Sequence, residues 1–305
     1  MSLESDMIID RRRLKRRLIF WRVVGVVAVV AAVVATAGRF DLSRDGDLIA
    51  RLDIQGIIVD DRLRHDALSN IAQNDHVKAL VVVINSPGGT FTGGENLYQA
   101  LRDVAKVKPV VAVMEGTAAS AGYMIALAAD HIIAHPGTIT GSIGVIMQTA
   151  DVTGLLEKIG IKPVVVKSGE LKAQPNPMET FGDEARAVTE AVVRDFYDMF
   201  VEIVIDRRSM SKNIAYSLAD GRIYSGRQAQ AIGLVDAVGR EKDALAWLSA
   251  SHEISDKLPL VDVEIDYKDE PWRELVGESL GKALFSERLR LDGVLSLWHP
   301  EGYLD

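Results

Sequence analysis

The hydrophobic and polar positions of the chain follow two different periods. Short continuous apolar runs such as "VKALVVVIN" (77–85) and "KPVVAVM" (108–114) have the length and the β-branched content of buried strands. Between them, "TGGENLYQALRDVAKV" (92–107) carries its apolar residues at helical spacing. Apolar strands joined by helix-sized connections are typical of a mainly parallel sheet with helices packed on it. The pattern therefore predicts an α/β fold.

The same two periods predict the other elements of the chain. They indicate a strand over 48–59 with a turn at Gly56, a helix over 63–74, two short strands within 131–147, a strand at 162–166 that ends in a loop, a long amphipathic helix over 183–210, and a helix over 225–232 followed by a short closing strand. From about Ser251 onward the charges are scattered and no period is visible. Residues 251–305 are therefore predicted to be a C-terminal extension, whose role the pattern does not indicate.

The N-terminal segment has the pattern of a membrane anchor. A basic cluster, "RRRLKRR" (11–17), precedes an apolar run over 18–38 that would rise roughly 31 Å as a helix, about the thickness of a hydrocarbon core. Positive flanks stay in the cytoplasm. We therefore predict a cytoplasmic segment (1–17), a transmembrane helix (18–38), a linker (39–47) and an extracytoplasmic remainder. A cleaved signal peptide is the alternative, because "ATA" (35–37) resembles a cleavage site.

Composition narrows the class of protein. The chain has 305 residues, of which 48% are hydrophobic, enough for one large domain or two small ones. A formal net charge of −8 argues against a nucleic-acid partner, because phosphate recognition needs a basic face. The absence of cysteine excludes disulfides, cysteine nucleophiles and thiolate metal sites. Any catalysis must use other groups.

One serine lies where a nucleophile is often found. In "GTAASAGYMIALAADHI" (116–132), Ser120 comes between a predicted strand and a predicted helix, where unpaired backbone N–H groups can stabilise a developing negative charge. The plain alternative is a serine that caps the helix. The turn "INSPGGT" (84–90) can present backbone N–H groups in the same way, and it lacks the spacing of a nucleotide-binding loop. Ser120 needs a base before it can act as a nucleophile.

Five motifs in order resemble the bacterial signal peptide peptidase family of the SppA type, in its short, single-unit form. They are "INSPGG", "AASAGYMIALAAD", "TITGSIGV", "VKSGELKA" and "GRIYSGRQAQAIGLVDAVG". The resemblance covers roughly residues 48–248, so we place a peptidase domain at 48–250. It implies a ClpP/crotonase-like fold of repeated β-β-α units and a serine protease with a Ser/Lys dyad.

The resemblance also implies a role for individual residues. The family nucleophile falls on Ser120, the general base on Lys172, and the serine that orients the lysine on Ser142. By analogy with related folds, the N–H groups of Gly89 and Ala121 would form the oxyanion hole. A lysine with its ordinary pKa of about 10.4 is protonated at neutral pH, and an apolar surrounding would lower that pKa.

The family further implies the surroundings in which such an enzyme works. Its substrates would be hydrophobic peptides such as released signal peptides, and it would need neither a cofactor nor a metal. The predicted location is the bacterial inner membrane, with a single span and an extracytoplasmic catalytic domain. Family members are thought to form homo-oligomeric rings, in which the serine and the lysine come from neighbouring subunits. A dyad within one chain is the other possibility.

Four other interpretations can be weighed on the sequence. A Ser-His-Asp protease of the Clp type would need a histidine after "GSIGV", where Met147 and Gln148 occur instead. His131 and His135 have metal-ligand spacing only, and strand ends describe them better. A crotonase-type acyl-CoA enzyme would not need Ser120. A membrane scaffold that retains the fold without hydrolysing anything is the alternative from a different class.

Overall fold

The computed structural model describes residues 21–22, 24–25, 46–265 and 294–297. The chain separates into two units, Met1–Gly46 and Asp47–Asp305, and the fold described here is that of the second. The predicted segment 1–17, most of the predicted span and nearly all of the linker lie outside the described residues. Within the part of the chain that is described, no helix is both long enough and apolar enough to span a bilayer.

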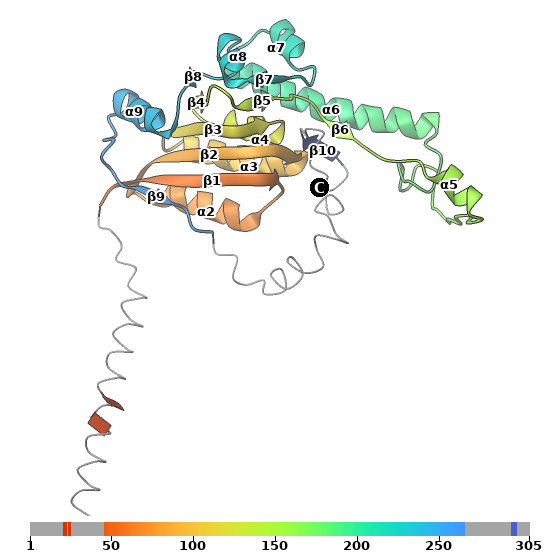
Figure 1. The fold of residues 1–305 in the computed structure, drawn as a ribbon, viewed down its shortest axis with the longest axis horizontal. Coiled ribbons are helices and arrows are strands. Elements are labelled where there is room, and N and C mark those ends of the chain that lie inside the picture. The colour runs from red at the N-terminus through yellow and green to blue at the C-terminus, as the bar shows by residue number, and fades with distance from the viewer. Residues whose placement is uncertain (1–20, 23, 26–45, 266–293, 298–305) are drawn as a thin grey trace, which may run out of the picture. The chain divides into compact units, whose positions relative to one another are not determined.

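Ten strands of the described residues form one sheet (Figure 1). They are β1 (Leu48–Ile58), β2 (Val77–Thr90), β3 (Val110–Ala119), β4 (His131–Ala134), β5 (Ile139–Gly141), β6 (Ile146–Met147), β7 (Ile223–Ser225), β8 (Ala237–Val238), β9 (Leu260–Asp262) and β10 (Val294–Leu297). The strands β9, β1, β2, β3, β4 and β8 lie side by side and parallel. The α/β fold expected from the pattern of apolar runs is confirmed.

Helices cover both faces of the sheet. They are α2 (Arg62–Gln73), α3 (Phe91–Ala105), α4 (Ala121–Ala126), α5 (Thr153–Lys158), α6 (Asp183–Arg208), α7 (Lys212–Leu218), α8 (Gly226–Ala231) and α9 (Glu241–His252). Alternate residues of a strand point to opposite faces. Leu80 and Val82 accordingly pack in one core with α2, α3, α4 and α6, whereas Val81 and Val83 pack on the other face with Leu248 of α9. Burial on both faces explains the continuous apolar runs.

Several local predictions are wrong. β1 runs through Gly56, which has a φ of 70° and causes a shift of register instead of a turn. β2 likewise continues through the predicted glycine turn as far as Thr90. The strand predicted at 162–166 does not form, and Val164 and Val166 are 89% and 96% exposed. A strand requires a hydrogen-bonding neighbour, and this β-branched run has none among the described residues of its own chain.

The elements that were not expected include α5, α7, β7, α9, β9 and β10. The last three involve the predicted C-terminal extension. α9 ends at His252, just inside it, β9 pairs with β1, and β10 pairs with both β2 and β6. Segments from this extension therefore add strands to two separate parts of the sheet.

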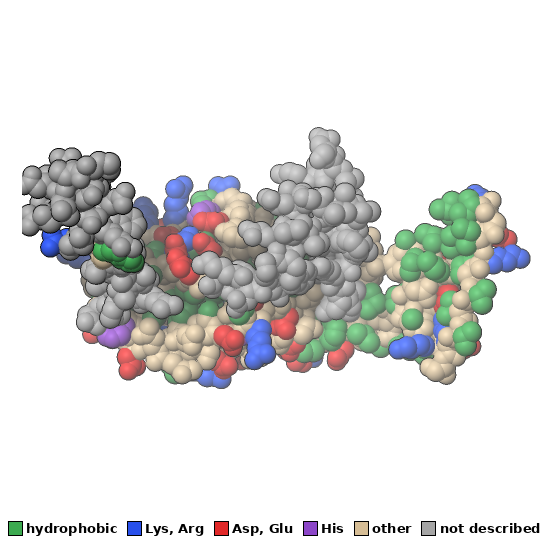
Figure 2. All heavy atoms as spheres, turned by 90° about the horizontal axis from the view of Figure 1, so that it is seen from below, with side chains coloured by type: hydrophobic (Ala, Val, Ile, Leu, Met, Phe, Trp, Pro, Cys, Tyr) green, Lys and Arg blue, Asp and Glu red, His purple; other side chains and the backbone are tan. Residues whose placement is uncertain are grey.

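Residues 152–182 form a projection that we call the arm. Figure 1 shows the arm, with α5, extending away from the sheet beyond one end of α6. No residue of α5 is buried. Hydrophobic side chains gather on the surface of the arm (Figure 2), and the large exposed ones are Leu155, Ile159, Ile161, Val164, Val165, Val166, Leu171 and Met178. Exposed apolar surface of this extent is typical of a site of protein association.

Candidate active site

Ser120 occupies a strained turn between β3 and α4. Its backbone angles are φ 55° and ψ −120°, a region that residues with a side chain adopt at a cost of about 1–3 kcal/mol. The Ser120 N–H donates to the carbonyl of Gly141 (2.9 Å), and the Ser120 carbonyl accepts from the N–H groups of Tyr123 and Met124. Although Ser120 holds the cap position of α4, its side chain does not cap the helix. The helix-capping interpretation of this serine is therefore wrong.

Small residues around Ser120 allow α3, α4 and β2 to meet closely. A Cβ atom added to Gly94 of α3 would come within 2.9 Å of the Cβ of Ala121, and one added to Gly122 would come within 2.8 Å of the carbonyl oxygen of Ser86. Both distances are too short for a side chain. The glycines and alanines that follow Ser120 are thus a packing requirement of the turn, which leaves Ser120 only 1% exposed.

The structure brings Ser142 next to Ser120. β5 runs parallel to β3 with Ala119 opposite Gly141, so each serine is the residue that directly follows its paired strand. Ser142 has a φ of 49°, is 9% exposed, and donates its N–H to the carbonyl of Arg222 (2.8 Å). The role predicted for Ser142, a hydrogen bond that orients the lysine, stays a prediction.

The two predicted oxyanion-hole residues lie at the same end of the sheet as Ser120. Ala121 is the first residue of α4, where backbone N–H groups lack helical acceptors. Gly89 lies at the end of β2, opposite Ile58 of β1, and a Cβ atom there would overlap the Ile58 carbonyl oxygen at 1.7 Å. Only glycine fits this position.

One supporting residue was not predicted. The buried hydroxyl of Ser86 accepts from the Gly88 N–H (3.1 Å) and so holds the strand end at a residue with a φ of 117°. A serine shortly after the apolar run 79–84 of β2 was the available signal.

Lys172 is not brought to Ser120 within the chain. It lies in the arm, which projects away from the sheet that carries the serine (Figure 1), and its side chain is exposed. The Lys172 N–H donates to the carbonyl of Gly169 (3.0 Å), while its ammonium forms no ion pair among the described residues. The apolar surrounding expected for this lysine is therefore absent from the described part of a single chain.

The strand β10 lies between β2 and β6, close to Gly89, and we call the position that it occupies the groove. β10 pairs antiparallel with residues 88–90 of β2 on one side and with residues 146–147 of β6 on the other. One wall of the groove therefore includes Gly89, and the other lies a few residues beyond Ser142. β10 thus forms backbone hydrogen bonds with β2 on one side and with β6 on the other.

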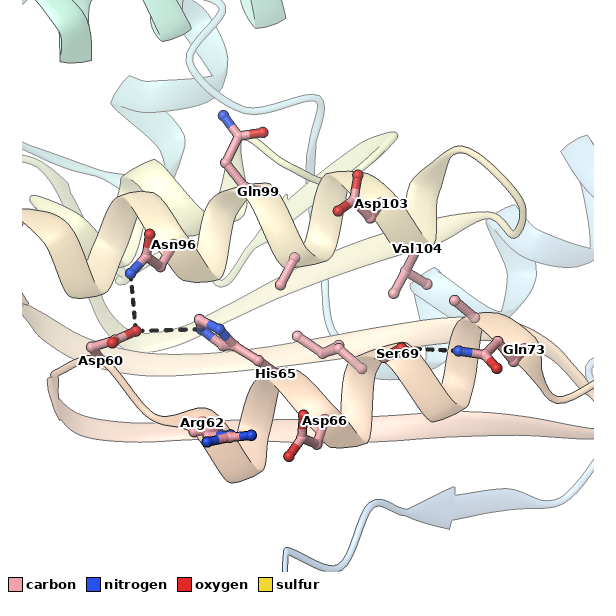
Figure 3. A pocket seen from close by; sticks show the side chains of 13 residues that line it. Asp60, Arg62, His65, Asp66, Ser69, Gln73, Asn96, Gln99, Asp103 and Val104 are labelled. Carbon is pink, nitrogen blue, oxygen red and sulfur yellow. Dashed lines mark hydrogen bonds and ion pairs between the residues drawn. The ribbon is translucent and has the colours of Figure 1, made fainter.

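A separate cavity of about 670 Å³ between α2 and α3 carries no comparable chemistry. Figure 3 shows Asp60 at its edge, accepting from the Asn96 side chain (3.0 Å) and facing His65 at 3.7 Å. None of the predicted site residues lines this cavity.

His131 is packed against the side chain of another element of the fold. His131 begins β4, and its ring stacks on Trp247 of α9 with centroids 4.7 Å apart. Burial lowers the pKa of His131, against the opposing effect of Asp236. No group of three or more potential metal ligands occurs among the residues that the structure describes.

A buried serine in a strained strand-to-helix turn, with backbone N–H groups around it, is the arrangement of a serine hydrolase. Family comparisons agree. A model of peptidase family S49 matches residues 102–255, about half of the chain, and a model of the Clp protease family matches residues 59–140.

Individual relatives give the same result. A "putative signal peptide peptidase SppA" of Enterococcus faecium is 32% identical over 274 residues, which are 84% of this chain and 78% of that protein. A "putative protease" of Methanocaldococcus jannaschii is 38% identical over 64% of this chain and 63% of its own length. Protease 4 of Haemophilus influenzae is 33% identical over 65% of this chain and 34% of its own length. The chain belongs to peptidase family S49, and it is a serine protease of the signal peptide peptidase SppA family.

The strained backbone of Ser120 gives a first prediction. Replacing Ser120 by glycine should give a higher free energy of unfolding than replacing it by alanine, by about 1 kcal/mol, because glycine adopts this conformation without a clash at Cβ. Denaturant unfolding of the two variants measures the difference. Ala119→Gly, one residue earlier in β3, is the control and should only destabilise. A Ser120→Gly variant less stable than Ser120→Ala would show that the turn is not strained.

Proposed function

We propose that the chain is a membrane-anchored endopeptidase with a Ser/Lys dyad, in which Lys172 of one subunit serves Ser120 of a neighbour. The observation that carries this proposal is the separation of the two residues. Ser120 is buried in a rigid turn, whereas Lys172 is exposed on an arm that leaves the sheet of its own chain. A lysine presented outward in this way is available to a second copy.

The chemistry follows from these groups. The neutral Lys172 amine takes the proton of the Ser120 hydroxyl while the serine oxygen bonds to the peptide carbonyl carbon. The carbonyl oxygen becomes an oxyanion near the N–H groups of Gly89 and Ala121. The C–N bond then breaks, and the leaving amine takes the proton from the lysine. Water then bonds to the acyl carbon while Lys172 takes a proton from it. The bond between the Ser120 oxygen and the acyl carbon breaks, and the serine oxygen takes the proton back from the lysine. In this scheme the Ser142 hydroxyl orients the amine.

The groove supports a peptide substrate in extended form. β10 shows that a strand fits between residues 88–90 and 146–147. A substrate bound in the same way would gain backbone hydrogen bonds that do not depend on its sequence. Its scissile bond would lie close to Gly89, on the side of Ser120. Hydrophobic peptides, including released signal peptides, are the substrates we propose on the strength of the family.

An oligomer accounts for the exposed apolar arm. The arm's eight large exposed hydrophobic residues lie on both sides of Lys172 in the sequence, so burying them against a neighbour would also surround the lysine with apolar groups. We propose a ring of identical subunits and a ClpP/crotonase-like arrangement of the domain. The match of the Clp protease model to residues 59–140 supports this arrangement.

We propose residues 18–38 as an uncleaved membrane anchor that leaves the peptidase domain on the extracytoplasmic side. The basic cluster before them and the length of the apolar run support this topology.

Mixed oligomers test the composite dyad. Ser120→Ala and Lys172→Ala should each lower cleavage of a fluorogenic peptide by about 10²–10⁴-fold or more, because one removes the nucleophile and the other the base. Mixing the two variants should restore part of the activity, since some sites then combine an intact serine with an intact lysine. Each variant mixed with itself is the control. If subunits exchange and no activity returns, both residues act within one chain.

The groove predicts that the C-terminal segment competes with substrate. A chain that ends at Gly293 should show a KM for peptides at least about threefold lower with kcat unchanged, because the groove no longer has to be vacated. A synthetic peptide of residues 294–305 should inhibit this shortened enzyme competitively. An unchanged KM together with no inhibition would place the substrate elsewhere.

The topology is tested in cells. Protease added to spheroplasts should digest the domain after residue 47, whereas a tag at the N-terminus should be protected. Sequencing the mature protein should recover the intact N-terminus. A mature chain that begins near Gly38 would identify a processed signal peptide instead.

A further inference from the structure

The segment that presents Lys172 is fastened by a single carboxylate. We call residues 167–179 the lysine loop. Glu179, at its end, accepts hydrogen bonds at Oε2 from the ammonium of Lys167, from the side-chain amide of Gln174 and from that of Asn176 (3.1 Å). The three donors come from both sides of Lys172. One acidic group therefore joins the beginning, the middle and the end of the loop.

Further bonds carry this fastening to the backbone next to Lys172. The Asn176 amide also donates to the carbonyl of Ala173 (3.0 Å), and its side-chain oxygen accepts from the Met178 N–H (3.0 Å). Ala173, directly after the lysine, has a φ of 62°, so the loop holds a conformation that alanine rarely adopts. Glu179 is the only acceptor in the structure's described residues that bonds the side chains of Lys167, Gln174 and Asn176 together.

Charge and exposure distinguish the two lysines of the loop. The side chains of Lys167 and Glu179 are 16% and 20% exposed, so the pair is sheltered although the surrounding arm is open. The hydrogen bond from Lys167 holds the pKa of Glu179 below its ordinary value, so this carboxylate stays charged at neutral pH. Lys167 is thereby committed to Glu179. Lys172 is the lysine that the loop leaves available.

We infer that Glu179 is a positioning residue for the peptidase reaction, and that it acts through the loop on the amine of Lys172. This inference rests on the proposed function. A base contributes to catalysis only when it is held within hydrogen-bonding reach of the serine, and a lysine on a free loop would lose that orientation. The carboxylate does not contact substrate. It fixes the backbone from which the base is presented to the neighbouring subunit.

The test introduces Glu179→Gln into one or the other of the two inactive variants and measures the activity of their mixture. In the mixture of Ser120→Ala and Lys172→Ala subunits, only the Ser120→Ala chain supplies a working lysine. Glu179→Gln on that chain should lower kcat about tenfold or more with little change in KM, because glutamine lacks the charge that holds Lys167. The same substitution on the Lys172→Ala chain should leave the activity of the mixture unchanged.

A matched control separates the fastening from the loss of a nearby charge. Glu170→Gln removes an exposed carboxylate only two residues from Lys172 and should not reduce kcat in either chain. If Glu179→Gln lowers activity equally on both chains, or on neither, Glu179 does not position the base.

Two further measurements keep the inference separate from folding and from the proposed assembly. Should Glu179→Gln fold poorly, the double variant Lys167→Met and Glu179→Met keeps the volume of the pair without its charges and should still show the lower kcat. If the mixture of Ser120→Ala and Lys172→Ala subunits, with Glu179 intact in both, regains no activity although subunits exchange, the composite dyad is contradicted. Glu179→Gln is then tested alone in the otherwise native chain. There, an unchanged kcat for Glu179→Gln overturns the inference.

Discussion

The backbone of Ser120 is the constraint on which the rest of the site depends. Its angles are unfavourable by about 1–3 kcal/mol for any residue with a side chain. The pairing of β3 with β5 compensates for this, since the Ser120 N–H bonds to the Gly141 carbonyl at the end of that pairing. Close packing of Gly94 and Gly122 against their neighbours leaves the turn no room to relax. The strain therefore persists because the surrounding sheet and helices determine it.

The two halves of the proposed dyad are held by different means. The serine lies at the centre of a sheet covered on both faces, where the apolar core fixes the backbone. The lysine lies on an arm with little core of its own, where polar bonds to Glu179 fix the loop locally. Because the base lies on an exposed arm and the nucleophile in the core, catalysis in the proposed function depends on the assembly of subunits. In the proposed function, a free subunit lacks the base beside its serine.

The period of apolar residues was sufficient to predict the elements that carry the nucleophile. β2, β3 and α3 are long, and their burial follows directly from the sequence pattern. The predicted helix over 183–210 forms as α6, but Val188 and Val192 of its apolar face are 50% and 40% exposed. The juxtaposition of Ser120 and Ser142 was not predicted, because it depends on the register of β3 with β5, which no local pattern specifies. β10 could not be predicted, because four residues become a strand only when distant edges of β2 and β6 accept them.

The error at residues 162–166 has a related cause. Three consecutive valines favour a strand, yet a strand forms only where another backbone accepts and donates its hydrogen bonds. No local pattern indicates that Glu179 bonds to residues on both sides of Lys172, because the loop must fold before these groups meet. Sequence pattern thus predicted elements with their own core and failed where long-range pairing decides the structure.

The central claim is that Ser120 is a nucleophile activated by a lysine of the assembled protein. Labelling the intact protein with a fluorophosphonate, followed by peptide mass spectrometry, tests this claim most directly. The account predicts a covalent adduct on Ser120, no adduct in Ser120→Ala and much slower labelling in Lys172→Ala. Folded, assembled protein that leaves Ser120 unlabelled, or that labels equally fast without Lys172, would contradict the account, and a complete absence of labelling would favour a non-catalytic scaffold.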